Sequence, residues 1–168
     1  MKYVTLAEYN QFYSGEIAAQ DFNRFVIGAS SLSDALTTGV DGVKKLKIAF
    51  PTDEADAEVV KAAICGVIHL MSEINDLEKT VSSGQGYVTR EDGTVLGKTI
   101  TSISSGSESI SYSASASGQT QASVLVGDSE AQNKVYRTIL EEGFRGIQDS
   151  NGVNLLYRGI YPLDVSEE

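Results

Sequence analysis

Apolar residues in the first part of the chain recur with the spacing of a helix. Between Ala18 and Leu36 they fall within about a third of a turn when residues are placed ~100° apart. Ile27 is the one apolar residue on the opposite, polar side. The apolar face consists of Phe22, Phe25, Val26, Ala29, Leu32 and Leu36, and the polar face of Asn23, Arg24, Ser31 and Asp34. The pattern predicts an amphipathic helix over these residues.

A longer helix is predicted from Thr52 to about Lys79. Thr52 is a preferred N-cap residue, and the acidic residues that follow it suit the positive end of the helix dipole. Two neighbouring apolar stripes together cover roughly 160° of the circumference. One consists of Val60, Ile64, Val67, Met71 and Ile74, and the other of Val59, Ala63, Gly66, Leu70 and Leu77. We therefore expect this helix to lie at the centre of the core.

Shorter elements are predicted towards both ends of the chain. Thr5 and Glu8 match a capping box, which begins a helix that continues to about Tyr13. Asp128 caps a last helix, whose apolar face consists of Ala131, Val135, Tyr136, Ile139 and Leu140. The segment 154–161 has the composition of a short strand.

The middle of the chain is rich in Ser and Gly. Residues 99–127 contain one charged residue, Glu108, and Ser occupies every odd position from 107 to 117. This period of two is typical of a strand. Together with the preceding segment 99–103 it predicts a β-hairpin with its turn near Gly106. The apolar face of such a ribbon is thin, so we expect it to need another surface for stability.

These elements define a mainly α fold. We expect a small helical bundle with a long central helix, a β-hairpin arm inserted before the last helix and a short C-terminal strand. The parts are a helical core (1–79), a Ser/Gly-rich loop and hairpin arm (80–127), and a C-terminal helix with closing strand and tail (128–168). A chain of 168 residues can bury enough surface to form one domain without disulfides or metal.

Composition excludes several classes of protein. The single Cys and single His can form neither an internal disulfide nor the four-ligand set of a structural zinc site. The longest apolar stretch, residues 62–68, is far shorter than the ~20 residues of a membrane-spanning helix. The N-terminus also lacks the apolar segment of a signal peptide. We therefore expect a cytosolic protein that uses no membrane.

The charge balance argues against nucleic-acid binding. The chain has 13 Lys and Arg against 23 Asp and Glu, a net charge of −10. Affinity for nucleic acids comes largely from cations that displace counterions from phosphates. The one basic cluster, Lys44, Lys45 and Lys47, falls in a segment (37–52) that its glycines and Pro51 predict to be a loop. We interpret it as a solvated turn.

Cys65 and His69 are the strongest candidates for catalysis. They are four residues apart and so share a face of the long helix. A thiolate beside an imidazole is the minimum for nucleophilic catalysis. A mid-helix position offers the thiol neither a helix N-terminus nor an oxyanion hole. We favour a polar or subunit-facing stripe, which would also include Glu58, Ser72 and Asp76.

Two other motifs are weaker. The segment 83–86 has two glycines at the spacing of a dinucleotide fingerprint but lacks the third, so we predict a loop. Asp53, Glu54 and Asp56 are better explained by helix capping than by a divalent cation. We therefore predict no enzyme activity, no cofactor and no metal site.

The order of the parts resembles the head-tail connector, or adaptor, family of long-tailed bacteriophages. The segments that carry the resemblance are Asp21-Phe22-Asn23-Arg24-Phe25, Val59-Val60-Lys61-Ala62-Ala63-Ile64, Ile103 to Tyr112, and Leu155-Leu156-Tyr157-Arg158-Gly159. Together they cover most of the chain in order. The resemblance implies a helical bundle with a β-hairpin arm that assembles into a ring beneath the portal protein, without catalysis.

On this resemblance we expect a virion structural protein of the phage neck, present in the host cytoplasm during assembly. The implied partners are further copies in a portal-matched, dodecameric ring, the portal protein, and a head-closure or tail-completion protein. Genomic DNA would pass through the ring without specific binding. The residues expected to contact the portal or a neighbouring subunit are Ile100, Ile103, Ile110, Tyr112, Leu155, Tyr157 and Arg158.

Several alternatives remain open from the sequence. The chain could instead be a head-closure or tail-completion protein of the same neck, an enzyme that uses Cys65 and His69, or an acidic cytosolic regulator. For Arg158, a bidentate contact to a carboxylate and an ordinary strand arginine are equally compatible with the sequence.

Overall fold

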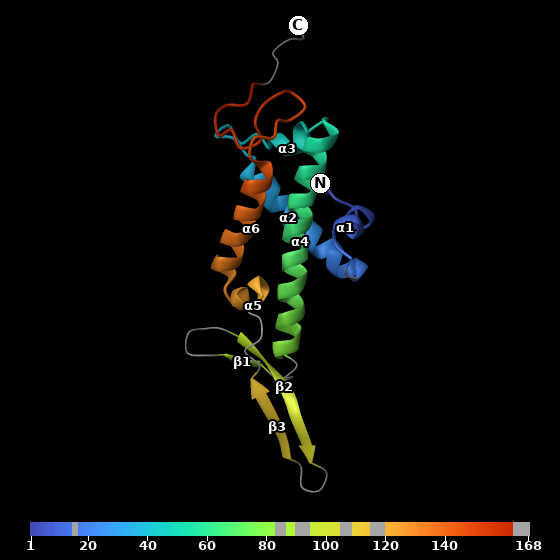
Figure 1. Ribbon diagram of the computed structural model, residues 1–168. Coiled ribbons are helices and arrows are strands. Elements are labelled where there is room, and N and C mark those ends of the chain that lie inside the picture. The colour runs from blue at the N-terminus through green and yellow to red at the C-terminus, as the bar shows by residue number, and fades with distance from the viewer. Residues whose placement is uncertain (15–16, 83–86, 90–94, 105–108, 115–119, 163–168) are drawn as a thin grey trace. The chain divides into compact units, whose positions relative to one another are not determined.

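The structure, a computed structural model, describes residues 1–14, 17–82, 87–89, 95–104, 109–114 and 120–162, with side chains for 1–14, 17–79 and 120–162. It is mainly helical (Figure 1), which confirms the mainly α part of the predicted fold class. The chain groups into two compact units. Unit 1 combines Met1–His69 with Asn133–Glu168, and unit 2 is Leu70–Gln132.

The described residues form helices and a small sheet. The helices are α1 (Leu6–Phe12), α2 (Ala19–Leu36), α3 (Lys45–Ile48), α4 (Glu54–Ser82), α5 (Gln121–Leu125) and α6 (Ser129–Phe144). The strands are β1 (Tyr87–Thr89), β2 (Val95–Ser104) and β3 (Ser109–Ala114). The single-turn helices α3 and α5 and the strand β1 were not predicted from the sequence.

The N-cap of one long helix is the predicted residue, and that of the other is the residue after it. The Asp53 carboxylate accepts a hydrogen bond of 3.0 Å from the Asp56 amide, so the cap of α4 is Asp53 and not Thr52 as predicted. The Asp128 carboxylate accepts from the Ala131 amide at 2.9 Å, which confirms Asp128 as the cap of α6. In both helices a carboxylate satisfies an amide that has no partner within the helix.

Helix α2 buries most of the face that its pattern predicted, with Leu32 only half-buried. Ile27 is exposed as expected, and the buried apolar residues are Phe22, Phe25, Val26, Ala29 and Leu36. Asp34, placed on the polar face by the pattern, is buried. The Tyr3 hydroxyl donates a hydrogen bond to its carboxylate, and the Tyr3 ring stacks on Phe50 at 5.8 Å. The N-terminal segment therefore covers this end of α2.

Helix α4 approaches its neighbours in unit 1 through small residues. A Cβ atom built on Gly66 would lie 3.4 Å from Ile139 of α6 and 3.5 Å from the hydroxyl of Tyr13, which follows α1. A Cβ atom built on Gly143 of α6 would lie 2.4 Å from the Cβ of Ala63. The backbones of α4 and α6 therefore meet at this pair. Figure 1 shows α1 and α6 on different sides of α4.

The sheet of unit 2 is antiparallel with the order β1-β2-β3. Strand β2 pairs with β3, and the partners include Ile100 with Tyr112 and Ile103 with Ile110. The register shifts by one residue between Ile100 and Ser102, as in a β-bulge. The predicted hairpin turn near Gly106, like the predicted helix-ending Gly15 and the loop 83–86, lies outside the described residues.

The register shift decides which residues share a face of the β2–β3 ribbon. Residues three apart in a regular strand lie on opposite faces. The extra residue in β2 brings both pairs of partners to one face, which consists by register of Ile100, Ile103, Ile110 and Tyr112 with Lys98 and Ala114. The other face consists by register of Thr99, Ser102, Ser104, Ser109, Ser111 and Ser113. The ribbon thus has one face with four large apolar positions, which ends at Lys98 and Ala114, and one face of hydroxyl positions.

The predicted strand over 154–161 is wrong. The segment makes one isolated bridge, between Gln148 and Asn154, and then turns. The Asn154 side chain accepts a hydrogen bond from the Leu156 amide at 2.9 Å, and the Tyr157 amide donates to the Asn154 carbonyl at 3.0 Å. An Asn side chain that bonds two residues onward stabilises a turn in place of a strand ladder.

We predict that replacing Gly143 with Ala destabilises the protein by about 1–3 kcal/mol, because the new methyl group overlaps Ala63. An ordinary Gly→Ala change in a helix would be stabilising by up to ~1 kcal/mol. The second change Ala63→Gly should recover most of the loss. The measurement is urea unfolding of the two single variants and the double variant. A double variant less stable than Gly143→Ala would contradict the close contact.

Candidate functional site

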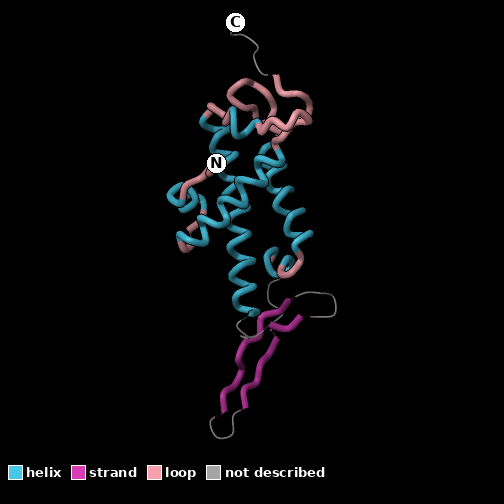
Figure 2. The backbone as a smooth tube through the Cα atoms, turned by 180° about the vertical axis from the view of Figure 1, so that it is seen from behind, coloured by secondary structure: helices cyan, strands magenta, loops and turns pink. Residues whose placement is uncertain are grey.

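Two loops pack together at one end of unit 1. We call residues 37–45 and 147–162 the loop cluster, which Figure 2 shows at the end of the helices. The Val40 amide donates to the Arg158 carbonyl at 3.0 Å. The Tyr161 amide donates to the Asp41 carboxylate at 2.6 Å. Both bonds join segments more than a hundred residues apart in sequence, so the loops hold each other.

Lys45 anchors the loop cluster from within. It is 1 % exposed, although the sequence predicted a solvated turn; Lys44 and Lys47 are exposed. Its ammonium group donates a hydrogen bond to the Tyr157 carbonyl and lies 6.0 Å from the centroid of the Tyr157 ring. Burial lowers the Lys45 pKa, and the nearby Arg158 charge lowers it further. The buried amine ties α3 to the C-terminal loop.

A second set of polar contacts stiffens the C-terminal loop. The Tyr161 hydroxyl donates to the buried Asp149 carboxylate at 2.6 Å and accepts from the Asn151 side chain at 2.9 Å. The other Asp149 oxygen accepts from the amides of Asn151 and Val153, each at 2.9 Å. Burial and the Asp149 bond raise the Tyr161 pKa. These bonds hold the loop in one conformation.

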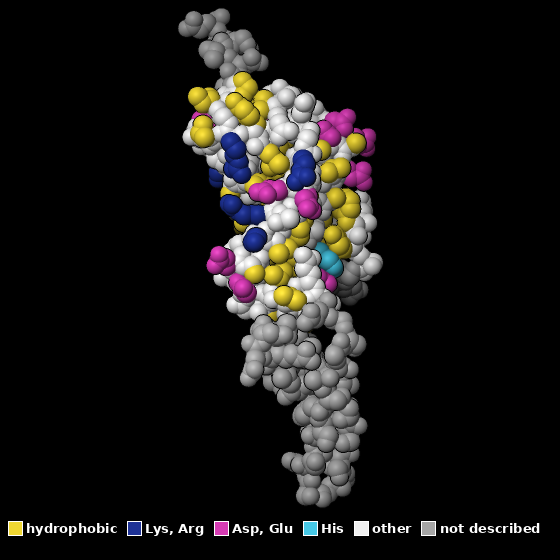
Figure 3. Space-filling view, turned by 60° about the vertical axis from the view of Figure 1, so that its left-hand side comes forward, with side chains coloured by type: hydrophobic (Ala, Val, Ile, Leu, Met, Phe, Trp, Pro, Cys, Tyr) yellow, Lys and Arg dark blue, Asp and Glu magenta, His cyan; other side chains and the backbone are white. Residues whose placement is uncertain are grey.

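The outer surface of this stiff frame is apolar. Val40, Tyr157 and Ile160 are 77 %, 48 % and 73 % exposed. Tyr157 and Ile160 themselves line a groove of about 370 Å³, together with Gly152, Val153, Asn154 and Pro162. Figure 3 shows hydrophobic side chains gathered at this end of unit 1. Clustered apolar side chains exposed on a stiff frame are typical of a protein-binding surface.

Exposed basic side chains are also found in the loop cluster and in α3, which begins at its end. Lys44, Lys47 and Arg158 are exposed and belong to, or directly follow, the loops that present the apolar residues. Two carboxylates of the loop cluster keep their charge: Asp41 accepts from the amides of Val43 and Tyr161, and Asp149 is buried. We call this combination of Val40, Tyr157, Ile160, Lys44, Lys47 and Arg158 the apolar-basic surface.

The predicted contact residues divide between the two units. In unit 1, Tyr157 and Arg158 lie on the apolar-basic surface, but Leu155 is fully buried and belongs to the core. Among the described residues no ion pair joins Arg158 to a carboxylate. In unit 2, the strand register makes partners of the four ribbon residues Ile100, Ile103, Ile110 and Tyr112.

Sequence reasoning missed Val40, Ile160 and Lys45. Val40 stands between Gly39 and Asp41-Gly42, a setting that favours a turn with its apolar residue outside. A turn signal around an isolated apolar residue could therefore have identified it. Burial of Lys45 has no local signal, because it depends on a carbonyl 112 residues later in the chain.

The Cys65 and His69 pair is not on a polar face as predicted. Cys65 is fully buried, and burial raises the pKa of its thiol to about 12, with a further contribution from the Glu8 carboxylate. His69 is hydrogen-bonded through Nδ1 to the Tyr9 hydroxyl at 3.0 Å and stacks on Tyr13 at 4.1 Å. The prediction of a polar face failed because Tyr9 of α1 and Tyr13 after it cover the face of α4 that carries Cys65 and His69. The geometry does not support a thiolate nucleophile.

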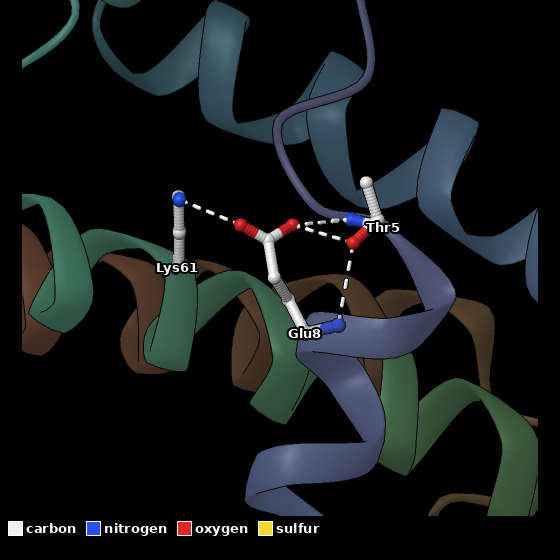
Figure 4. Close-up of polar contacts among 3 residues, drawn as sticks. All are labelled: Thr5, Glu8 and Lys61. Carbon is white, nitrogen blue, oxygen red and sulfur yellow. Dashed lines mark hydrogen bonds and ion pairs between the residues drawn. The ribbon is translucent and has the colours of Figure 1, made fainter.

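A second groove lies between α1 and α4, around an ion pair. The Glu8 carboxylate accepts from the Thr5 amide and hydroxyl at 2.8 and 2.7 Å, which confirms the capping box. Its other oxygen pairs with the Lys61 ammonium at 2.6 Å (Figure 4). The Lys61 bond, followed by the Thr5 bonds, lowers the Glu8 pKa to about 2. The groove measures about 300 Å³ and is lined by Glu8, Gln11, Phe12, Glu54, Ala57, Glu58 and Lys61.

Neither metal clusters nor membrane spans appear in the described part of the chain. No group of three or more His, Cys, Asp or Glu side chains there could hold a metal ion. None of the helices there is both long and apolar enough to cross a membrane.

Comparison with known proteins gives no relative for this chain. No protein-family model, no curated protein and no solved structure matches it. The site geometry is therefore the basis for a functional proposal.

We predict that Cys65 does not react with an aromatic disulfide reagent in the folded protein and reacts fully after unfolding in urea, because the thiol is buried and protonated. The matched control is Ser31→Cys in a Cys65→Ala background, since Ser31 is an exposed position of α2. The control thiol should react at once. Equally fast labelling of Cys65 in the native protein would revive the enzyme alternative.

We predict that Glu8→Gln lowers stability by about 1 kcal/mol at neutral pH, because the pair is partly exposed and screened. The Glu8 pKa is lowered from 4.5 to about 2 on folding. Its stabilisation is therefore complete above pH 4.5 and is lost as the pH falls towards 2. Urea unfolding of both proteins across this range tests it, with the exposed Glu141→Gln as control. A difference that does not depend on pH would mean that the Glu8 charge is irrelevant.

Proposed function

We propose that the chain is a structural protein of the phage neck, a head-tail connector that forms a ring beneath the portal. In this role it passes the genome through its ring and presents a docking surface to the next neck component. The segments that resemble the connector family and the arrangement of the ribbon support this proposal. The β-hairpin arm and its contact with the portal or a neighbouring subunit are part of the proposal.

The observation that carries the proposal is the register of β2 and β3. It collects the apolar positions Ile100, Ile103, Ile110 and Tyr112 on one face of a narrow ribbon. A ribbon of this size buries too little of its own surface to be stable alone. An apolar face of this kind gains stability by packing against another protein surface, as assembly proteins require.

The loop cluster supports the same role, contact with another protein, for unit 1. Its exposed apolar residues lie on a frame held by the buried Lys45 and by the Asp149–Tyr161 contacts. A surface that is already ordered loses little conformational entropy when a partner binds. The protein thus offers one preordered contact surface in unit 1 and one ribbon face in unit 2.

The acidic character of the chain suits a conduit for DNA. With a net charge of −10, the chain repels the duplex and does not hold it by counterion release. A genome that must slide past a ring is helped by the absence of adhesive cationic sites. A head-closure or tail-completion protein of the same neck would share these properties, and only the identity of the direct partner separates the two proposals.

The test of the proposed function is deletion of the gene in its phage. We expect capsids that package DNA but fail to retain it or to join tails. Electron microscopy of the lysate shows this, and DNA binding of the purified protein is measured in parallel. Tailed, infectious particles without the gene would exclude the connector role. Salt-sensitive binding to duplex DNA would indicate a DNA-handling protein.

A pair of variants in β3 tests the ribbon. We predict that Ile110→Lys abolishes incorporation into particles, because it places a charge among the four large apolar positions, away from Lys98 at the end of this face. Ser113→Lys lies by register on the hydroxyl face of the same strand and should incorporate normally. Complementation of the deletion phage with each variant gives the readout. Equal incorporation of the two would exclude the apolar face as a contact.

A further inference from the structure

We propose that the apolar-basic surface of one copy binds the acidic groove between α1 and α4 of a second copy, in a head-to-tail contact. The inference rests on the proposed function only in taking the partner to be another copy of this chain. Both surfaces belong to unit 1, so the contact requires nothing of the ribbon.

Charge complementarity points to this occupant. Two copies with a net charge of −10 each repel at a distance, so a stable contact has to place local positive charge against negative charge. The apolar-basic surface supplies exposed Lys44, Lys47 and Arg158. No ion pair engages these three among the described residues. They are therefore available to a partner.

The groove between α1 and α4 has the opposite character. Glu54 and Glu58 are exposed on its α4 wall, and Asp53 is exposed just before them. Lys61, the one cation in its lining, is already paired with Glu8. The remaining charge of the groove is therefore negative.

Each surface also carries apolar area for the other to bury. Phe12 lines the acidic groove and is partly exposed. Val40, Tyr157 and Ile160 are exposed on the apolar-basic surface. An interface with apolar anchors inside a rim of opposite charges has the composition of stable protein contacts. Charge fixes the orientation, and the apolar residues add affinity.

The two surfaces are different patches, so the contact is heterologous. In Figure 1 α1 lies on one side of α4, and the C-terminal loops lie towards the other. A contact between different patches leaves one of each free on every pair of copies. It therefore repeats from copy to copy and gives a closed ring or an open filament.

Charge reversal tests the contact with purified full-length protein. Arg158→Glu and Glu58→Lys should each weaken self-association about tenfold or more, because each places like charges together. The matched controls are Arg137→Glu and Glu141→Lys, which change the net charge by the same amounts at exposed positions of α6. These controls should assemble like the wild type. Sedimentation velocity over a range of concentrations is the readout.

Mixing the two charge-reversed proteins gives the decisive result. A head-to-tail contact restores opposite charges in an equimolar mixture, so the mixture and the double variant should both regain wild-type assembly. Normal assembly of either single variant, or no rescue on mixing, would overturn the contact while leaving the connector role intact. A wild-type protein that stays monomeric at its highest soluble concentration would overturn the contact as well. The phage deletion tests the connector role independently.

Discussion

The close approach of α4 to its neighbours is the constraint on which unit 1 depends. A long helix can bury most of its circumference only if helices reach it on several sides. Gly66 lies within reach of both Ile139 of α6 and Tyr13 after α1, and Gly143 meets Ala63 with no room for a side chain. Small residues thus bring the backbones together and let larger neighbours fill the core. Helix α1 packs against the face of α4 that carries Cys65, so Cys65 is buried.

The loop cluster is organised by polar groups where the helices are organised by apolar ones. A buried ammonium group is costly unless it finds acceptors, and Lys45 finds the Tyr157 carbonyl. Asp149 likewise accepts from two amides and from the Tyr161 hydroxyl. These groups use their hydrogen-bonding capacity inside the protein. The apolar residues between them are consequently left facing outwards, which gives this end of unit 1 its character as a contact surface.

The sequence predicted what local periodicity and capping determine. The helices α2 and α4, the capping box of α1 and the cap of α6 were all visible, because each depends on residues within a few positions of one another. The burial of Asp34 and Lys45 was not visible, since it depends on Tyr3 and Tyr157, which lie 31 and 112 residues away. The segment 154–161 was misassigned as a strand because its apolar composition favours a strand. The turn depends on one side chain, that of Asn154, which accepts a hydrogen bond from the Leu156 amide.

The candidate surface was predictable only in part for the same reason. Tyr157 and Arg158 were identified, whereas Leu155 from the same run is in the core. A strand would have placed Leu155 and Tyr157 on one face, but the turn at Asn154 separates them. Val40 joins the surface through a hydrogen bond to Arg158 that no pattern along the chain reports.

The register shift in β2 lets two apolar residues at an odd spacing, Ile100 and Ile103, share one face of the ribbon. Beyond the extra residue, every position of β2 lies on the face opposite to the one it would occupy in a regular strand. Losing the extra residue between Ile100 and Ile103 would leave these two residues two apart, so a regular strand would still place both on the apolar face. Keeping the residue but pairing without the shift would place Ile103 among the hydroxyl positions. In related chains, the extra residue and the shift should therefore be gained or lost together.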